Sequence, residues 1–186
     1  MRRPNSTYAV TSLVLILLCV NPLIETMEGK SAILFMFSHY ALFFAGFILS
    51  YRSLRWNWYT LIAGVSLAAF WHFPVPFALS GAFLLYRIME EGSMVAAGFL
   101  VGAAVEPLPS VTRPVLFGLW IAADSALSVV FIIHPSLYSS GDISYSPFSA
   151  AQFVLLGVLM IFFMNSVIGV FVYVYAKRYR ALISAE

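Results

Sequence analysis

The sequence has few charged residues and almost no cysteine. Only 10% of its 186 residues are charged, and the mean hydropathy is +0.93. A typical soluble domain has about a quarter of its residues charged. Ten basic and eight acidic residues leave a net charge of +2, too weak a balance to indicate nucleic acid as a partner. The single cysteine, Cys19, excludes a disulfide framework within the chain. The composition predicts a membrane protein whose surroundings are lipids.

Long apolar windows predict an all-α, polytopic bundle of six transmembrane helices, which form one integral membrane domain over residues 1–186. Each span must be helical because the bilayer core offers no water to the backbone amides. Spans of about 20 residues each leave no room for a catalytic domain outside the membrane, and we expect a protein that is not an enzyme. The predicted spans are residues 8–24, 32–50, 58–73, 88–105, 115–134 and 150–175.

Pro74 and Pro76 end the third predicted span. The following residues, 75–86, are too few to cross the bilayer independently. We interpret them as a shallow or re-entrant piece. The alternative is a fourth span that begins earlier and runs through Gly81.

The distribution of Lys and Arg predicts that both termini are cytoplasmic, because short cytoplasmic loops retain basic residues. The outer side would carry only Lys30 and Arg87. A cleaved signal peptide is not favoured, since residues 18–22 lack a small-x-small cleavage pattern. We therefore expect a multi-pass protein of the cell membrane. The eight basic residues on the predicted inner side are Arg2, Arg3, Arg52, Arg55, Arg113, Lys177, Arg178 and Arg180.

Gly98 and Gly102 have the small-x-x-x-small spacing that lets two helix backbones approach closely. In a six-helix bundle we expect this pair to pack within the chain. A contact between two copies of the chain is the less favoured interpretation.

Ionisable side chains inside a bilayer are costly, by about 2.5–3.5 kcal/mol at a helix centre, so those that persist are candidates for function. Under the predicted topology nearly all of them fall in the outer half of the bundle, and only Asp124 lies nearer mid-depth. No polar path toward the inner face is visible, which argues against a proton-driven transporter. The polar groups at membrane depth are His39, His72, Glu90, Glu91, Asp124, His134 and Gln152.

A copper site is chemically reasonable among these residues, because imidazole and thioether ligands suit Cu(I). Met36 and His39 are three residues apart and share one helical face. We predict a metal site of His39 and His72, assisted by Met36 or Glu91. Each histidine also has a simpler interpretation as a structural hydrogen-bonding group at the interface.

Several segments together resemble the CtaG-type cytochrome c oxidase assembly proteins, and also a group of small archaeal membrane proteins of unknown function. The resemblance covers roughly residues 36–160, and Trp-His-x-Pro is its most specific part. The chain departs from the family at three places. Met36 or Phe35 occupies the position of a second histidine before His39, and Glu90-Glu91 occupies the position of an acid followed by histidine. Gln152 alone remains of a polar pair at the start of a later helix. The matching segments are Phe37-Ser38-His39-Tyr40-Ala41-Leu42, Trp71-His72-Phe73-Pro74, Glu90-Glu91-Gly92-Ser93-Met94, Ala97-Gly98-Phe99-Leu100, Leu137-Tyr138 and Gly157-Val158-Leu159-Met160.

The resemblance implies a helical membrane factor that helps to mature a haem-copper oxidase, with respiratory oxidase subunits as partners and copper held on the outer side by His39 and His72. Two alternatives remain open. The chain is either a structural subunit of a respiratory or other membrane complex without its own metal, or, with less support, a b-type cytochrome with two histidine ligands.

Overall fold

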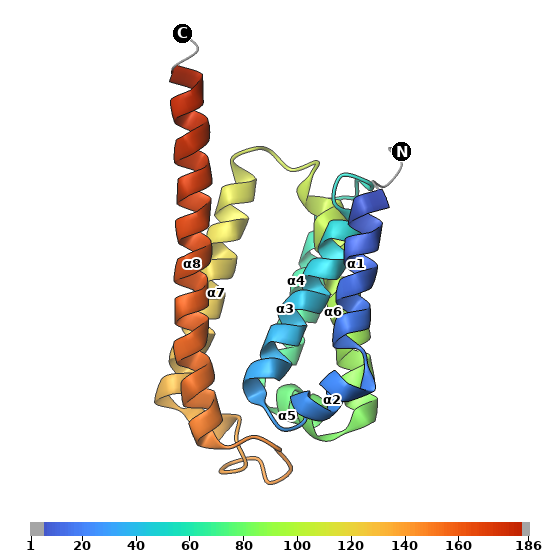
Figure 1. The fold of residues 1–186 in the computed structure, drawn as a ribbon, viewed down its shortest axis with the longest axis vertical. Helices are drawn as coiled ribbons and strands as arrows, with labels where there is room; N and C mark the ends of the chain where they lie inside the picture. Colours follow the sequence, from blue (N-terminus) through green and yellow to red (C-terminus); the bar gives the residue numbers. More distant parts are fainter. Residues whose placement is uncertain (1–5, 184–186) are drawn as a thin grey trace.

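The computed structural model describes residues 6–183, with side chains through Lys177. This part of the chain forms an all-α bundle with one short 3-10 turn (Figure 1). The predicted fold class is confirmed. The elements are α1 (Ser6–Cys19), α2 (Pro22–Glu28), α3 (Ala32–Ser50), α4 (Trp58–Trp71), α5 (Pro74–Ala82), α6 (Leu84–Val105), α7 (Thr112–Ile133), the short η1 (Pro135–Leu137) and α8 (Ala150–Ile183).

Four of these helices, α3, α6, α7 and α8, are long and apolar enough to cross a membrane. Two more spans are bent pairs: α1 with α2 at 59°, and α4 with α5 at 69°. With each bent pair taken as one span, the number is six. The cytoplasmic orientation of the termini stays a prediction. Of the residues it rests on, Arg2 and Arg3 lie outside the described residues, as do the side chains of Arg178 and Arg180.

The first bend corrects the predicted span over residues 8–24. Asn21 is extended and its side chain accepts hydrogen bonds from the amides of Leu23 and Ile24, each at 3.1 Å. Pro22 follows as the first residue of α2. Asparagine at the cap and proline at the first helical position start a new helix, so α1 ends at Cys19 and α2 leaves in another direction.

The second bend has the same cause, since Phe73 is extended and Pro74 opens α5. This short bent helix agrees with the predicted shallow or re-entrant piece. The alternative, a fourth span that runs through Gly81, is wrong because extended Phe83 separates α5 from α6. α6 then begins at Leu84, four residues before the predicted start at Ile88.

Helix α6 lies at the centre of a unit formed by α1–α6 and packs most extensively against α3 and α4. Glycines make the contact with α3 very close: a Cβ built on Gly98 would lie 1.8 Å from the Phe43 carbonyl oxygen, and one on Gly102 would lie 2.4 Å from that of Phe47. The Gly98–Gly102 spacing is therefore used for packing within the chain, as predicted.

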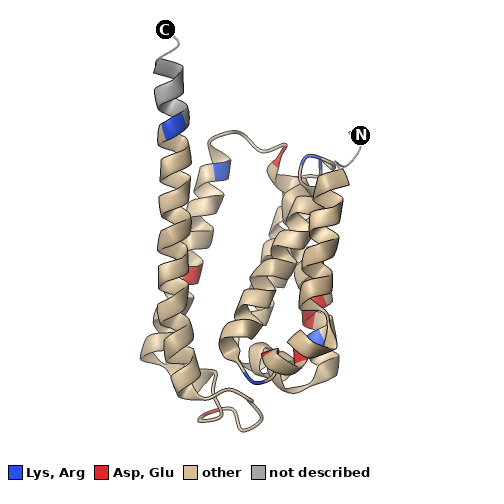
Figure 2. Cartoon of the chain, viewed as in Figure 1, with Lys and Arg blue, Asp and Glu red and all other residues tan. Residues whose placement is uncertain are grey.

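Helices α7 and α8 form a hairpin that packs mainly on itself. It lies closest to α3 at the end of the bundle that carries α2, α5 and the loop before α8, and it diverges toward the chain termini (Figure 1). We call the end with α2 and α5 the site end. Acidic residues gather there, whereas basic residues lie mainly at the opposite end (Figure 2).

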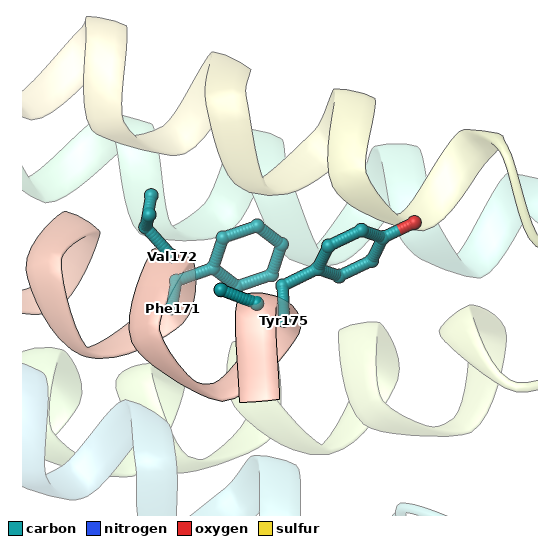
Figure 3. Close-up of a pocket in the computed structure, with 4 residues that line it drawn as sticks. Phe171, Val172 and Tyr175 are labelled. Atoms are coloured by element: carbon teal, nitrogen blue, oxygen red, sulfur yellow. The ribbon is translucent and has the colours of Figure 1, made fainter. Parts of the chain in front are cut away.

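The largest apolar cluster joins α3 and α5 to the hairpin, with Phe35, Phe77, Phe131, Phe148 and Phe153 all fully buried. At the other end of α8, Phe171 and Tyr175 border an open surface hollow of about 360 Å³, whose lining also includes Val172 and Ala176 (Figure 3). This hollow is apolar and lies away from the histidine pair.

Candidate functional site

His39 lies inside the bundle on α3 and is 2% exposed. Its Nδ1–H donates to the Phe35 carbonyl oxygen one turn earlier, at 2.6 Å. A carbonyl can only accept, so this contact fixes the proton on Nδ1. The ring packs against the edge of Phe35, with centroids 4.4 Å apart, and stacks on Phe77 at 5.9 Å. The imidazole therefore has one orientation, with Nε2 directed toward α6.

Glu90 on α6 meets that nitrogen, with its Oε1 2.9 Å from His39 Nε2. Both side chains are almost completely buried. Because Nδ1 already carries a proton, a neutral ring would present a lone pair to the carboxylate, and two acceptors do not approach so closely without a cation between them. A proton shared by the pair meets this need, and α3 and α6 are joined by it.

His72 caps the C-terminus of α4 at the bend before α5. Its Nδ1–H donates to the Ala68 carbonyl oxygen at 2.8 Å, which again leaves Nε2 as the nitrogen with a free lone pair. The centroids of the His39 and His72 rings are 6.0 Å apart, with an interplanar angle of 69°. Two imidazoles from α3 and α4 therefore converge, each with its tautomer fixed by a helix carbonyl.

The other two predicted metal ligands lie in different surroundings. Glu91 is buried, with Glu90, Glu28 and Arg87 among its charged neighbours. Met36 is fully buried within the apolar cluster of aromatic rings. Within residues 6–183, no three side chains of His, Cys, Asp or Glu form a group that could hold a metal ion. The structure thus brings together two imidazoles and Glu90.

The remaining polar residues of the prediction are apart from this site. Asp124 is buried on α7 beside Tyr40 and Trp120, and its Oδ2 has no hydrogen-bond partner among the described residues. His134 is exposed at the C-cap of α7. Gln152 at the start of α8 donates to the Lys30 carbonyl oxygen at 3.0 Å and accepts from the Ala32 amide at 3.3 Å. Gln152 therefore fastens the hairpin to the beginning of α3.

Arg87 is the main residue whose role the sequence did not predict. Its guanidinium is 8% exposed and donates to three backbone carbonyl oxygens: those of Ser80 at 3.2 Å, Gly81 at 2.6 Å and Glu25 at 2.7 Å. It also lies 5.6 Å from the centre of the Phe35 ring. Arg87 thus joins the ends of α2 and α5 to α6. The sequence feature that indicates this role is the short distance between Arg87 and Gly81, which lets the side chain reach the end of the preceding helix.

Glu28 at the end of α2 was also missed. It is 1% exposed and accepts a hydrogen bond from the Ser38 hydroxyl. Cys19, which is 8% exposed, has Ser38, Glu28 and Glu91 as its polar neighbours. His39 therefore belongs to a larger buried polar cluster, which contains the three carboxyl groups of Glu28, Glu90 and Glu91, and partly exposed His72 borders it.

Comparison with known proteins gives one match. No curated protein and no solved structure matches the chain. One family, described as a protein of unknown function (DUF1404), matches residues 10–178. That range covers most of the first span, all or nearly all of the other five, and every residue of the buried polar cluster. The chain therefore belongs to the DUF1404 family of membrane proteins.

Proposed function

We propose that this protein is a non-enzymatic accessory factor for a haem-copper respiratory oxidase of the cell membrane, and that it holds Cu(I) between His39 and His72. The observation that supports this best is the convergence of the two imidazoles, whose centroids are 6.0 Å apart. Both Nδ1 atoms are occupied by helix carbonyls. The two Nε2 atoms are then the ligands, as is usual where a second contact fixes the ring.

The donor set fits a soft ion of low coordination number. Two imidazoles bound to one ion at about 2.0 Å, on opposite sides, have their ring centres roughly 6 Å apart. A two-ligand site suits Cu(I), which does not require a planar set of four donors as Cu(II) does. The bound ion would supply the oxidase with copper in its reduced form. Glu90, which shares the proton of His39 in this structure, would turn toward the ion or away from it.

The charge of the cluster also favours a cation. Glu28, Glu90 and Glu91 supply three buried carboxyl groups, whereas Arg87 is the one guanidinium beside them among the described residues. Burial of uncompensated negative charge is costly. A monovalent ion bound between His39 and His72, with loss of the proton that His39 shares with Glu90, leaves the buried charge unchanged.

The partner in this proposal comes from the resemblance to CtaG-type proteins. The segments that carry it include Trp71-His72-Phe73-Pro74 and the region of His39 and Glu90. We propose oxidase subunits as the recipients of the ion. These same segments contain the converging imidazoles, so the metal and the partner depend on one site.

The metal content of the purified protein tests the proposal. Full-length protein from copper-supplemented cells is compared with His39→Gln, His72→Gln and, as the matched control, His134→Gln, which changes an exposed histidine outside the cluster. We expect about one copper per wild-type or His134→Gln chain and a loss of at least tenfold in the other two. Equal copper in all four, with monodisperse protein on size exclusion, would end the copper proposal.

A structural subunit is the second candidate, and a specific set of contacts favours it. Buried polar groups join helices directly: Ser12 Oγ donates to the Ala45 carbonyl oxygen at 2.7 Å, and Ser50 Oγ donates to that of Phe99 at 2.7 Å. Trp71 Nε1 donates to Ser93 Oγ at 2.5 Å. Purification with a respiratory complex at fixed stoichiometry and without copper would support this candidate.

A b-type cytochrome would need a porphyrin between the imidazoles. Phe35 and Phe77 already cover the His39 ring, so haem would have to displace them. A Soret band in protein from haem-replete cells would support this third interpretation, and colourless protein would remove it.

A further inference from the structure

The loop between η1 and α8, residues 138–149, lies at the site end of the bundle (Figure 1). We call it the closing loop. Its first residue, Tyr138, is 4% exposed and donates its hydroxyl hydrogen to the His72 carbonyl oxygen at 2.8 Å. This single hydrogen bond ties the loop to the residue that carries one of the two imidazoles.

The other end of the closing loop inserts an aromatic ring beside the site. Phe148 is fully buried, and its ring lies 5.5 Å from Phe35 and 6.1 Å from Phe77. These two rings are the ones that cover His39. Tyr138 also contacts Phe77, at 5.7 Å. The loop therefore presses on the aromatic layer that separates His39 from the site end.

Internal hydrogen bonds hold the closing loop together as a unit. Ser146 Oγ donates to the Tyr138 carbonyl oxygen at 2.7 Å, and the Ser140 amide donates to the Phe148 carbonyl oxygen at 3.1 Å. The two anchoring residues are thus linked across the loop. Displacement of one favours displacement of the other.

We infer that the closing loop is a gate for the histidine pair: closed, it keeps His39 buried and His72 only partly exposed, and opened, it gives a small solute access to both from the site end. With the Proposed function, which supplies the identity of the solute, the gate controls the exchange of Cu(I). Tyr138 is then a positioning residue, because it acts through the backbone of His72. Phe148 is the plug.

Histidine modification tests the gate without any metal. Purified full-length protein is treated with diethylpyrocarbonate, and the modification of each histidine is followed by peptide mass spectrometry. His134 is exposed and serves as the internal reference. We compare wild type with Tyr138→Phe, which removes only the hydroxyl group, and Phe148→Ala, which removes the plug. Tyr145→Phe, at an exposed position of the same loop, is the matched control.

In wild type and in Tyr145→Phe we expect slow modification of buried His39, and modification of partly exposed His72 that is faster than that of His39 but slower than that of exposed His134. In Tyr138→Phe the rate at His72 should rise about fivefold, the factor that corresponds to one net hydrogen bond. The rise in Phe148→Ala should be larger and include His39. Wild-type rates at both histidines in Tyr138→Phe and Phe148→Ala would overturn the inference. It would also be overturned if His134 were accelerated by the same factor, because that result indicates general loosening.

A second measurement separates this inference from the Proposed function. Protein loaded with Cu(I) is mixed with excess bathocuproine disulfonate, and copper transfer is followed by absorbance. A gate changes the entry and exit rates together, so Tyr138→Phe should release copper about fivefold faster with an unchanged equilibrium affinity. Wild type that binds no copper ends the Proposed function, and the modification rates still decide the gate. If both loop variants bind copper but release it at the wild-type rate, the gate is overturned and the Proposed function is not.

Discussion

The contact between α3 and α6 can be tested by the addition of one methyl group at Gly98. A Cβ there would lie 1.8 Å from the Phe43 carbonyl oxygen and 2.9 Å from the Phe47 amide nitrogen, both of which are backbone atoms. Non-bonded carbon and oxygen atoms prefer about 3.5 Å, so the helices must separate locally by roughly 1.5 Å. No side-chain rotation relieves this clash.

Overpacking of this kind costs about 1–3 kcal/mol. We expect the upper part of that range, because Gly46 and Gly102 make equally close contacts along the same helix pair. Alanine is a better helix former than glycine by up to about 1 kcal/mol. The net loss for Gly98→Ala is therefore about 2 kcal/mol. Gly92→Ala, in the same helix, meets no atom within 4 Å and is the matched control.

The assay is unfolding of the purified protein in mixed micelles with increasing dodecyl sulfate, followed by circular dichroism and by size exclusion. Gly98→Ala should unfold at a clearly lower dodecyl sulfate fraction than wild type, and Gly92→Ala should not. Identical midpoints for the two variants would refute the packing argument. A change in oligomeric state with an unchanged midpoint would instead assign Gly98 to a contact between chains.

Two further predictions concern the backbone and pH. Arg52 has a positive φ of 64°, a region disfavoured for side chains with a Cβ, so Arg52→Gly should stabilise the protein by about 0.5–1 kcal/mol. Ser53→Gly should not, and equal midpoints for the two variants in the same micelle assay would contradict the expectation. Burial raises the pKa of Tyr138 to about 12, so the stability from this protonated phenol is fully present below about pH 10 and is lost as pH rises through 12. Between pH 9 and 12 the free energy of unfolding of wild type should fall by up to about 2–3 kcal/mol more than that of Tyr138→Phe. Parallel pH profiles of unfolding for the two proteins would contradict the assignment.

Sequence patterns predicted α3 and the bend at Pro74, but not the bend at Asn21. The predicted limits of residues 32–50 agree with α3, because Ser31 caps its start and a turn follows Ser50. In the first span the hydropathy continues past residue 20 without interruption, and only Asn21 and Pro22 mark the new helix. Hydropathy averages over the window and does not detect a change of direction. Local cap chemistry at Asn21 and Pro22 does mark this change.

The predicted span starts at Ile88, four residues after Leu84, because the sequence pattern places Arg87 as a charge outside the bilayer. The structure instead gives Arg87 three carbonyl oxygens from α2 and α5. Such contacts depend on where other helices end, which a single helix pattern does not contain.

The convergence of His39 and His72 followed from depth alone, since both fall toward the same end of the bundle. Which glutamate meets His39 did not follow. Glu90 and Glu91 are adjacent, about 100° apart around the helix, and both are buried. The rotation of α6 against α3 is set by Gly98 and Gly102, so the choice of Glu90 depends on glycine packing two turns away.

The contacts of Arg87 also determine an order of events during synthesis. The Ser80 and Gly81 carbonyl oxygens at the end of α5 accept hydrogen bonds from Arg87, and lipid could not donate to them. Their donor belongs to α6, which leaves the ribosome after α5. We therefore expect the end of α5 to settle only once α6 has entered the bilayer. The histidine end of the bundle is completed after insertion, in a step that a truncated nascent chain lacking α6 cannot perform.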